Sequence, residues 1–114
     1  MIKIKTIHHV NVPSREESLG AMHEFYSTVF GMSDLERPSD QIGRPGLWMH
    51  YGDKELHVSM PGRTPHVALE IENYDEAKQI LAEKGIKFQE STRIGQQLFI
   101  EDPEGNFIEL RPAD

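Results

Sequence analysis

Three histidines and one glutamate are the residues of this chain whose types and positions could support chemistry. His9 and His66 each precede a valine in a strand-like segment, and His57 and Glu109 lie at matching places near the ends of the two halves. Imidazole nitrogens and a carboxylate suit divalent Zn, Ni, Mn, Co or Fe ions. Because the chain has no cysteine, such an ion would be held by nitrogen and oxygen ligands. A single strand histidine is more often structural, so the prediction rests on the repeated pattern.

The elements that would position these residues repeat along the chain. Each half begins with a strand-like segment and continues with an amphipathic helix that ends at a glycine, Gly31 or Gly85. The expected capping boxes at the helix starts pair Ser14 with Glu17 and Asn73 with Glu76. The apolar residues predicted to form the buried stripes are Leu19, Met22, Tyr26, Val29 and Phe30 in the first helix, and Ala77, Ile80 and Leu81 in the second.

Short strands separated by turns complete each half. We expect strands at residues 32–37, 47–51 and 55–60, and again at 86–91, 96–101 and 106–111. A loop is predicted at residues 38–46, and a boundary at the Pro/Gly segment 61–65. Neither βαβββ unit has enough apolar surface to be stable alone. We therefore predict one α+β domain of tandem βαβββ modules, with module one at 1–62 and module two at 63–114.

Strand alternation predicts which side chains share a face. Side chains along a strand point to opposite faces in turn. The residues expected to pack under the helices are Val10, Val12, Val67, Leu69 and Ile71. His9, Asn11 and His66 would then face the other way, and in the last strand Glu109 shares a face with Phe107. A curved sheet would turn His9, His57, His66 and Glu109 inward, whereas His8 would face the helix side or solvent.

Composition excludes several classes of function. The net charge of −7 argues against nucleic acid as a partner, because nucleic-acid binders usually carry a basic stripe. The first residues lack the apolar run of a signal peptide, and no stretch of membrane-spanning length follows, so we expect no membrane partner and a cytoplasmic location.

Four segments carry a resemblance to a known family over nearly the whole chain. HHVNV, EFYSTVFGM, HVALEI and FIEDPEGNFIEL resemble the vicinal oxygen chelate superfamily, which includes glyoxalase I, fosfomycin-resistance enzymes, methylmalonyl-CoA epimerase, extradiol dioxygenases and bleomycin-resistance proteins. The resemblance implies paired βαβββ modules in an open, eight-stranded mixed sheet around a metal ion. It also implies His9, His66 and Glu109 as ligands, and a homodimer. His57 occupies the place of a fourth ligand, where glyoxalase I and the epimerase usually have Glu or Gln.

The implied chemistry is bidentate coordination of neighbouring oxygens on a small-molecule substrate, with the ion as a Lewis acid. Glu109 is then also a candidate catalytic residue. The residues predicted to contact substrate are Asn11, Trp48, His50, Phe99 and Arg111. Candidates that orient the ligands are Asn11, Gln97 and Tyr51. Arg44, Arg93 and Arg111 are candidates for an anionic substrate group, although each also fits a solvated surface position.

Three functions remain open at this point. The first is a metal-dependent lyase, isomerase or thiol transferase of the glyoxalase type. The second is an Fe(II) dioxygenase, for which two histidines and one carboxylate suffice. The third is a metal-free binding protein of the bleomycin-resistance type with an aromatic-lined groove, for which Trp48, Tyr51 and Phe99 are candidates. One fold hosts many functions, so fold alone does not choose among them.

Overall fold

The computed structural model describes residues 1–38, 42–60, 65–92 and 95–113. The chain forms two compact units, which we call the first unit (His9–Pro65) and the second unit (Met1–His8 with His66–Asp114). The first strand, β1 (Ile4–Pro13), passes from the second unit into the first between His8 and His9. Among the described residues, no helix has both the length and the apolar character that crossing a membrane requires.

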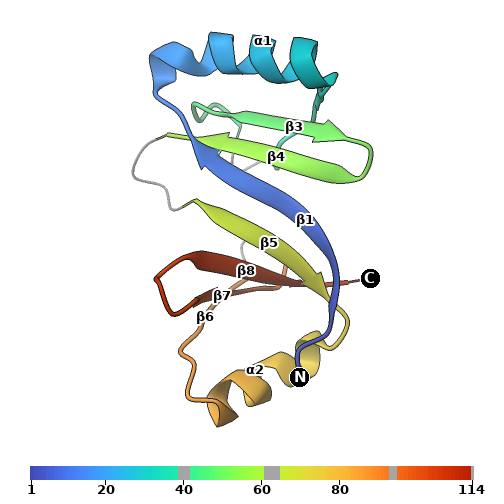
Figure 1. Ribbon diagram of the computed structural model, residues 1–114, viewed down its shortest axis with the longest axis vertical. Helices are drawn as coiled ribbons and strands as arrows, with labels where there is room; N and C mark the ends of the chain where they lie inside the picture. Colours follow the sequence, from blue (N-terminus) through green and yellow to red (C-terminus); the bar gives the residue numbers. More distant parts are fainter. Residues whose placement is uncertain (39–41, 61–64, 93–94, 114) are drawn as a thin grey trace. The chain divides into compact units, whose positions relative to one another are not determined.

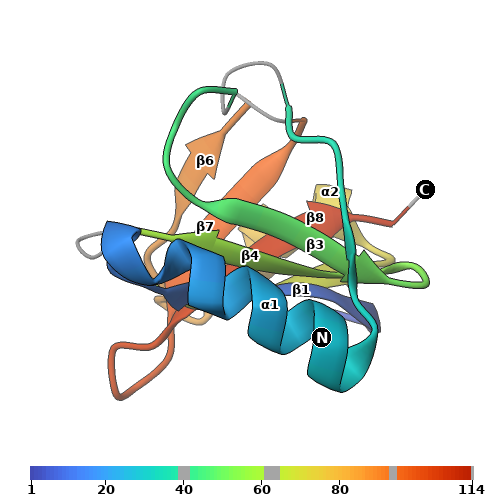
Figure 2. The same cartoon turned by 90° about the horizontal axis from the view of Figure 1, so that it is seen from above.

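The first unit contains one helix and four strands. After β1 come a 3-10 turn (Glu16–Ser18), α1 (Leu19–Phe30), β2 (Ser33–Asp34), β3 (Leu47–Tyr51) and β4 (Lys54–Ser59). The strand order is β2-β3-β4-β1, with β1 parallel to β4 and the other pairs antiparallel. In both views α1 runs alongside the β3–β4 hairpin (Figures 1 and 2). Met49, Leu56 and Val58 are buried on one face of these strands.

The second unit repeats this plan. It contains β5 (His66–Ile71), α2 (Tyr74–Glu83), β6 (Gln89–Ser91), β7 (Gln97–Glu101) and β8 (Phe107–Pro112). The strand order is β1-β5-β8-β7-β6, with β5 parallel to β8 and β7 antiparallel to both β6 and β8. The predicted α+β class, with two βαβββ modules and eight strands in mixed directions, is confirmed. The division of a single domain at residues 62 and 63 stays a prediction.

The two helices end as predicted but begin differently. Gly31 and Gly85 have φ values of 70° and 69°, a left-handed conformation that glycine adopts without a steric penalty. The expected capping box of Ser14 is wrong, because its hydroxyl donates to the Arg15 carbonyl and the α-helix starts only at Leu19. Asn73 does precede α2, but its side chain bonds the main chain of Met1 and Lys3 instead of capping the helix.

The second unit has the better packed core. The cluster of buried side chains joins α2 to the strands beneath it and consists of Ile71, Tyr74, Ala77, Leu81, Leu98 and Leu110. By contrast, α1 buries none of its residues, so the predicted buried stripe of the first helix is wrong. Val10 and Val67, also expected to be covered, are 37% and 38% exposed.

The remaining strands and loops follow the sequence with shorter bounds. The strand expected at residues 32–37 is limited to Ser33–Asp34, and the one expected at 86–91 to Gln89–Ser91. Residues 42–46 of the predicted loop contain neither helix nor strand. Residues 39–41 of that loop, most of the predicted boundary at 61–65, and Arg93 lie outside the described residues.

Candidate functional site

Strand register gathers four of the singled-out side chains on one face of the first unit. His9 pairs with Glu55 and Asn11 with His57 across β1 and β4, while Trp48 pairs with His57 across β3 and β4. Paired residues on neighbouring strands point to the same face. His9, Asn11, His57 and Trp48 therefore lie on the face opposite the buried Met49, Leu56 and Val58.

Three of these side chains form a row of stacked rings. The ring centroids of Trp48 and His57 are 3.7 Å apart with an interplanar angle of 17°. Those of His57 and His9 are 3.9 Å apart with an angle of 27°. His57 is therefore held between an indole and a second imidazole, and its position limits how the His9 ring can turn.

Glu55 fixes the orientation of the middle ring. The Nε2 nitrogen of His57 lies 2.8 Å from the Glu55 carboxylate. Because an ionised carboxylate only accepts hydrogen bonds, Nε2 is the donor in this contact. Sequence reasoning missed Glu55, although its position two residues before His57 on the same strand places it on the same face and was a usable signal.

Two predicted substrate contacts in the first unit have local partners. Asn11 donates from Nδ2 to the Ser59 hydroxyl at 3.0 Å. The Nδ1 of His50 is 3.1 Å from the carbonyl oxygen of Gly52, in the turn that follows its own strand. Tyr51 is 68% exposed. Their roles toward substrate or ligands stay predictions.

A second cluster of predicted site residues lies within the second unit. It is built around charged side chains, whereas the first is built around stacked rings. Ala68 pairs with Glu109 across β5 and β8, and Phe99 with Glu109 across β7 and β8. The Nε2 of His66 is 3.3 Å from one oxygen of Glu109, and the Nε of Arg111 is 3.6 Å from the other. Phe99 meets the His66 ring edge to face, with centroids 6.3 Å apart. The structure thus brings together an imidazole, a carboxylate and a guanidinium.

Glu109 is held in its ionised form despite its burial. Only 2% of the residue is exposed, and this desolvation acts to raise the pKa of the carboxyl. Hydrogen bonds from His66 and Gln97, together with the charges of His66 and Arg111, outweigh the desolvation and lower the pKa below its usual value. A buried carboxylate that remains charged beside an imidazole is a donor set that fits a divalent metal ion.

His8 corrects a further expectation. A guanidinium nitrogen of Arg111, Nη1, is 2.8 Å from Nδ1 of His8, so His8 does not simply face the helix side or solvent. The two residues are far apart in the sequence, and no local pattern signals their contact. Arg111 therefore lies beside both His8 and Glu109, which fixes the guanidinium within the second unit.

The predicted site residues thus fall into two groups. His9, His57, Trp48 and Asn11 belong to the first unit, and His66, Glu109, Phe99 and Arg111 to the second. Arg44 and Trp48 line a cavity of the first unit together with Arg37, which sequence reasoning missed. The complete ligand set of His9, His66 and Glu109, with His57 as a fourth member, stays a prediction.

Solved structures of similar fold include a glyoxalase/bleomycin resistance protein/dioxygenase superfamily member from Vibrio splendidus 12B01. That protein is 11% identical, with a TM-score of 0.67 and coverage of 95% of this chain and 100% of the other. Methylmalonyl-CoA epimerase from Mycobacterium tuberculosis is 19% identical, with a TM-score of 0.70 and coverage of 97% and 90%. At these identities the likeness shows the fold alone.

A third similar structure is a mutant of homoprotocatechuate 2,3-dioxygenase from Brevibacterium fuscum. It is 16% identical, with a TM-score of 0.72, and the match covers 98% of this chain but only 33% of the dioxygenase chain. This chain therefore spans about a third of that enzyme.

No curated protein matches the sequence. A family model, however, matches residues 6–110, which is nearly the whole chain and includes both clusters. The chain belongs to the Glyoxalase/Bleomycin resistance protein/Dioxygenase superfamily.

Proposed function

We propose that the chain is a divalent-metal-dependent enzyme that acts on a small, oxygen-rich substrate through bidentate coordination. The proposed ligands are His9, His66 and Glu109, and the proposed reactions are those of a glyoxalase-like lyase, isomerase or thiol transferase. The observation that carries the proposal is the pair of His66 and Glu109, 3.3 Å apart, with the carboxylate buried and its pKa lowered.

The surroundings of the proposed ligands support this assignment. A buried carboxylate is costly unless it is paired, and Glu109 remains charged through His66, Gln97 and Arg111. His9 follows His8, and His8 is the last residue of β1 that belongs to the second unit. Its imidazole is oriented by the stack with His57. Groups that orient metal ligands in this way commonly raise metal affinity.

The bound ion would supply Lewis acidity toward the oxygens of the substrate. Arg111 lies 3.6 Å from Glu109 and holds the carboxylate as an anion. We propose that this carboxylate also accepts a proton from a carbon beside a carbonyl group, which makes Glu109 the catalytic base. Phe99 packs edge to face against His66 and restricts rotation of that imidazole.

Metal analysis tests the proposal directly. Purified protein is expected to hold close to one divalent ion per chain, and His66→Ala to hold almost none. His23→Ala is the matched control. His23 lies in α1, and within the described residues its ion-pair partner is Asp34 and not a proposed ligand. Equal, near-zero metal in the unmodified protein and in His66→Ala would reject a metal-dependent function. Assays with methylglyoxal plus a thiol, fosfomycin, methylmalonyl-CoA and catechols would then separate the reactions.

An Fe(II) dioxygenase is the second candidate function. Two imidazoles and one carboxylate match the ligand set of non-haem Fe(II) oxygenases, and similar folds include a homoprotocatechuate 2,3-dioxygenase. This chain spans only about a third of that enzyme. Oxygen uptake with catechols after anaerobic loading with Fe(II) would favour this candidate over the first. A metal-free binding protein, the third alternative, requires that the purified chain hold no ion.

We also propose that the protein is a homodimer. Phe25, Val29 and Phe30 of α1 are 50%, 58% and 57% exposed, and exposed apolar clusters commonly mark protein interfaces. Light scattering coupled to gel filtration is expected to give twice the chain mass of 13.1 kDa. A monomer at all concentrations would reject the dimer, whereas the metal proposal would stand. The cytoplasmic location stays a prediction.

A further inference from the structure

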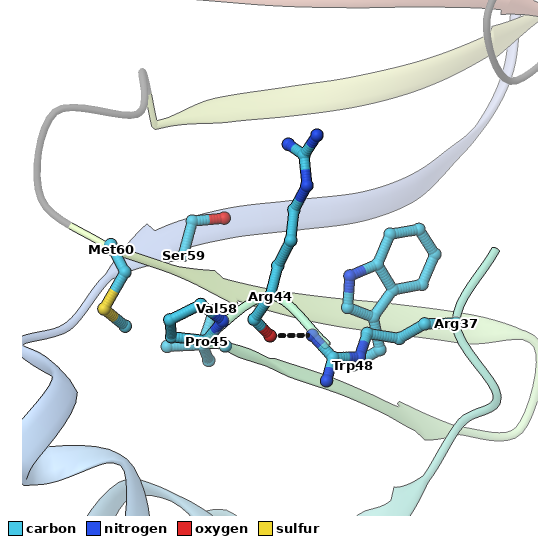
Figure 3. Close-up of a pocket in the computed structure, with 8 residues that line it drawn as sticks. Arg37, Arg44, Pro45, Trp48, Val58, Ser59 and Met60 are labelled. Carbon is cyan, nitrogen blue, oxygen red and sulfur yellow. Dashed lines mark hydrogen bonds between the residues drawn. The ribbon is translucent and has the colours of Figure 1, made fainter. Parts of the chain in front are cut away.

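A small cavity is lined by residues of the first unit alone. It has a volume of about 220 Å³ and is lined by the loop before β3 and by the end of β4 (Figure 3). The lining residues are Arg37, Arg44, Pro45, Gly46, Trp48, Val58, Ser59 and Met60. Two arginines thus line one cavity of a chain whose net charge is −7, and the Arg44 side chain extends away from the Arg37 guanidinium (Figure 3).

The two arginines are available to an anion. Arg37 donates from Nη1 to the main-chain oxygen of Arg44 at 2.6 Å, which ties its guanidinium to the loop and leaves its other N–H groups for a ligand (Figure 3). Within residues 1–38, 42–60, 65–92 and 95–113, no carboxylate forms an ion pair with either guanidinium. A guanidinium that has no carboxylate partner can bind a carboxylate or phosphate group in a bidentate way.

The rest of the lining is suited to an apolar body. Pro45, Met60 and the indole of Trp48 supply apolar surface, and the Ser59 hydroxyl adds one polar group. A cavity of about 220 Å³ is smaller than the roughly 300–1,000 Å³ of pockets for drug-sized ligands. The ligand that fits is therefore small, about the size of one ring with one charged group.

Gly46 shows that the cavity wall is closely packed. Its φ is +145°, and a Cβ at this position would lie 2.6 Å from the carbonyl oxygen of Val58. Only glycine lets the loop approach β4 this closely, and the same approach keeps Arg44 and Pro45 beside Val58. The wall is thus set by main-chain packing as well as by long side chains.

We propose that this cavity binds a small organic anion, with a carboxylate or phosphate held by the guanidinium of Arg44, in a cavity that Arg37 also lines, and a flat or apolar body beside Trp48. The inference goes beyond the metal-dependent reaction, because each cavity residue belongs to the first unit and none is a proposed ligand. Trp48 also stacks on His57, so an anion bound here would adjoin the row of rings that ends at His9.

The chain offers a built-in reporter for the test. Trp48 is its only tryptophan, so intrinsic indole fluorescence reports on the surroundings of this one cavity residue. The full chain, stripped of metal with EDTA, is titrated with benzoate, with phenyl phosphate and with neutral benzamide. We expect saturable fluorescence changes with one or both anions, weakened by added salt, and at least about tenfold weaker binding of benzamide. Preference between the two anions identifies carboxylate or phosphate as the better headgroup.

Three variants complete the test. Arg44→Gln is expected to weaken anion binding about tenfold or more, the size of effect that loss of one charge-assisted hydrogen bond produces. Arg44→Lys keeps the charge and should lose less. The matched control Arg15→Gln removes an exposed arginine outside the cavity and should bind like the unmodified chain. Circular dichroism checks that each variant is folded.

Two results would overturn the proposal. One is the absence of any saturable change with both anions, and the other is equal affinity in Arg44→Gln and Arg15→Gln. Because all titrations use metal-free protein, neither result depends on the proposed metal function. Conversely, a protein that holds no metal could still bind the anions.

Discussion

The two halves of the molecule share one order of elements but differ in how their helices are packed. In the second unit, α2 buries Tyr74, Ala77 and Leu81 against β7 and β8. In the first unit, α1 buries no residue and exposes Phe25, Val29 and Phe30. A repeated strand and helix pattern therefore fixes the type of each element, whereas the apolar area that each helix removes from water differs between the copies.

The equivalent positions at the ends of the two halves also differ in surroundings. His57 on β4 is stacked between two rings and bonds to Glu55. Glu109 on β8 lies among His66, Gln97 and Arg111. The two equivalent positions therefore differ in their interactions. His57 is held by ring stacking and by its bond to Glu55, whereas Glu109 is held by charged and polar neighbours. Four predictions test this division.

Truncation of matched apolar residues in the two helices should have very different effects on stability. Leu81→Ala should lower the free energy of unfolding by about 2–5 kcal/mol, because the side chain is 2% exposed and its loss leaves a cavity. Val29→Ala should change it by less than about 0.5 kcal/mol in the monomer, since Val29 is 58% exposed. Urea denaturation measures both. Equal losses would show that α1 is as well packed as α2.

Substitution of the two equivalent positions should separate a ligand from a positioning residue. Glu109→Gln is expected to weaken metal binding by more than about 100-fold, because the anionic ligand is lost. His57→Gln should weaken it about 10-fold to 100-fold by freeing the His9 ring. Competition with a fluorescent chelator measures both affinities. Equal losses would contradict the difference in role and make His57 a fourth ligand.

The ring stack should contribute measurably to the stability of the first unit. His57→Ala removes contacts with both Trp48 and His9 and should cost about 1–3 kcal/mol, since each aromatic pair adds roughly 0.5–1.5 kcal/mol beyond area burial. His57→Phe keeps a flat ring between them and should recover part of the loss. Unfolding followed by Trp48 fluorescence is the measurement. A Phe variant as unstable as the Ala variant would show that the bond to Glu55, and not stacking, is what stabilises.

The pH dependence of unfolding should report the charge cluster of the second unit. Burial acts to raise the pKa of the Glu109 carboxyl. His66, Gln97 and Arg111 lower the pKa by more than burial raises it, so the pKa lies below its usual value of 4.5. Folding therefore favours the ionised carboxylate. Its contribution to stability is present above about pH 4.5 and disappears as the pH falls through the lower pKa of the folded state. The slope of stability against pH below this value should be shallower in Glu109→Gln than in the unmodified chain.

Much of the fold was predictable because it depends on local patterns. Alternating side chains, helical spacing and the glycines at 31 and 85 predicted the order of strands and helices, and the structure confirms it. The same alternation predicted that His9, Asn11 and His57 share a face within the first unit, as the strand register shows. The start of the first helix and the side-chain caps of both helices were mispredicted, because Ser14 and Asn73 had other main-chain groups within reach.

The order of the elements, the family and the residue types able to hold a metal ion could all be predicted from the amino-acid sequence. These follow from periodicity and chemical identity, which are properties of neighbouring residues. Two contacts could be learned from the fold alone: that of Arg111 with His8, and that of Arg37 with the main chain of Arg44 beside one cavity. Both contacts join residues separated by a loop or by much of the chain, so they depend on strand register and loop path, which no local pattern encodes.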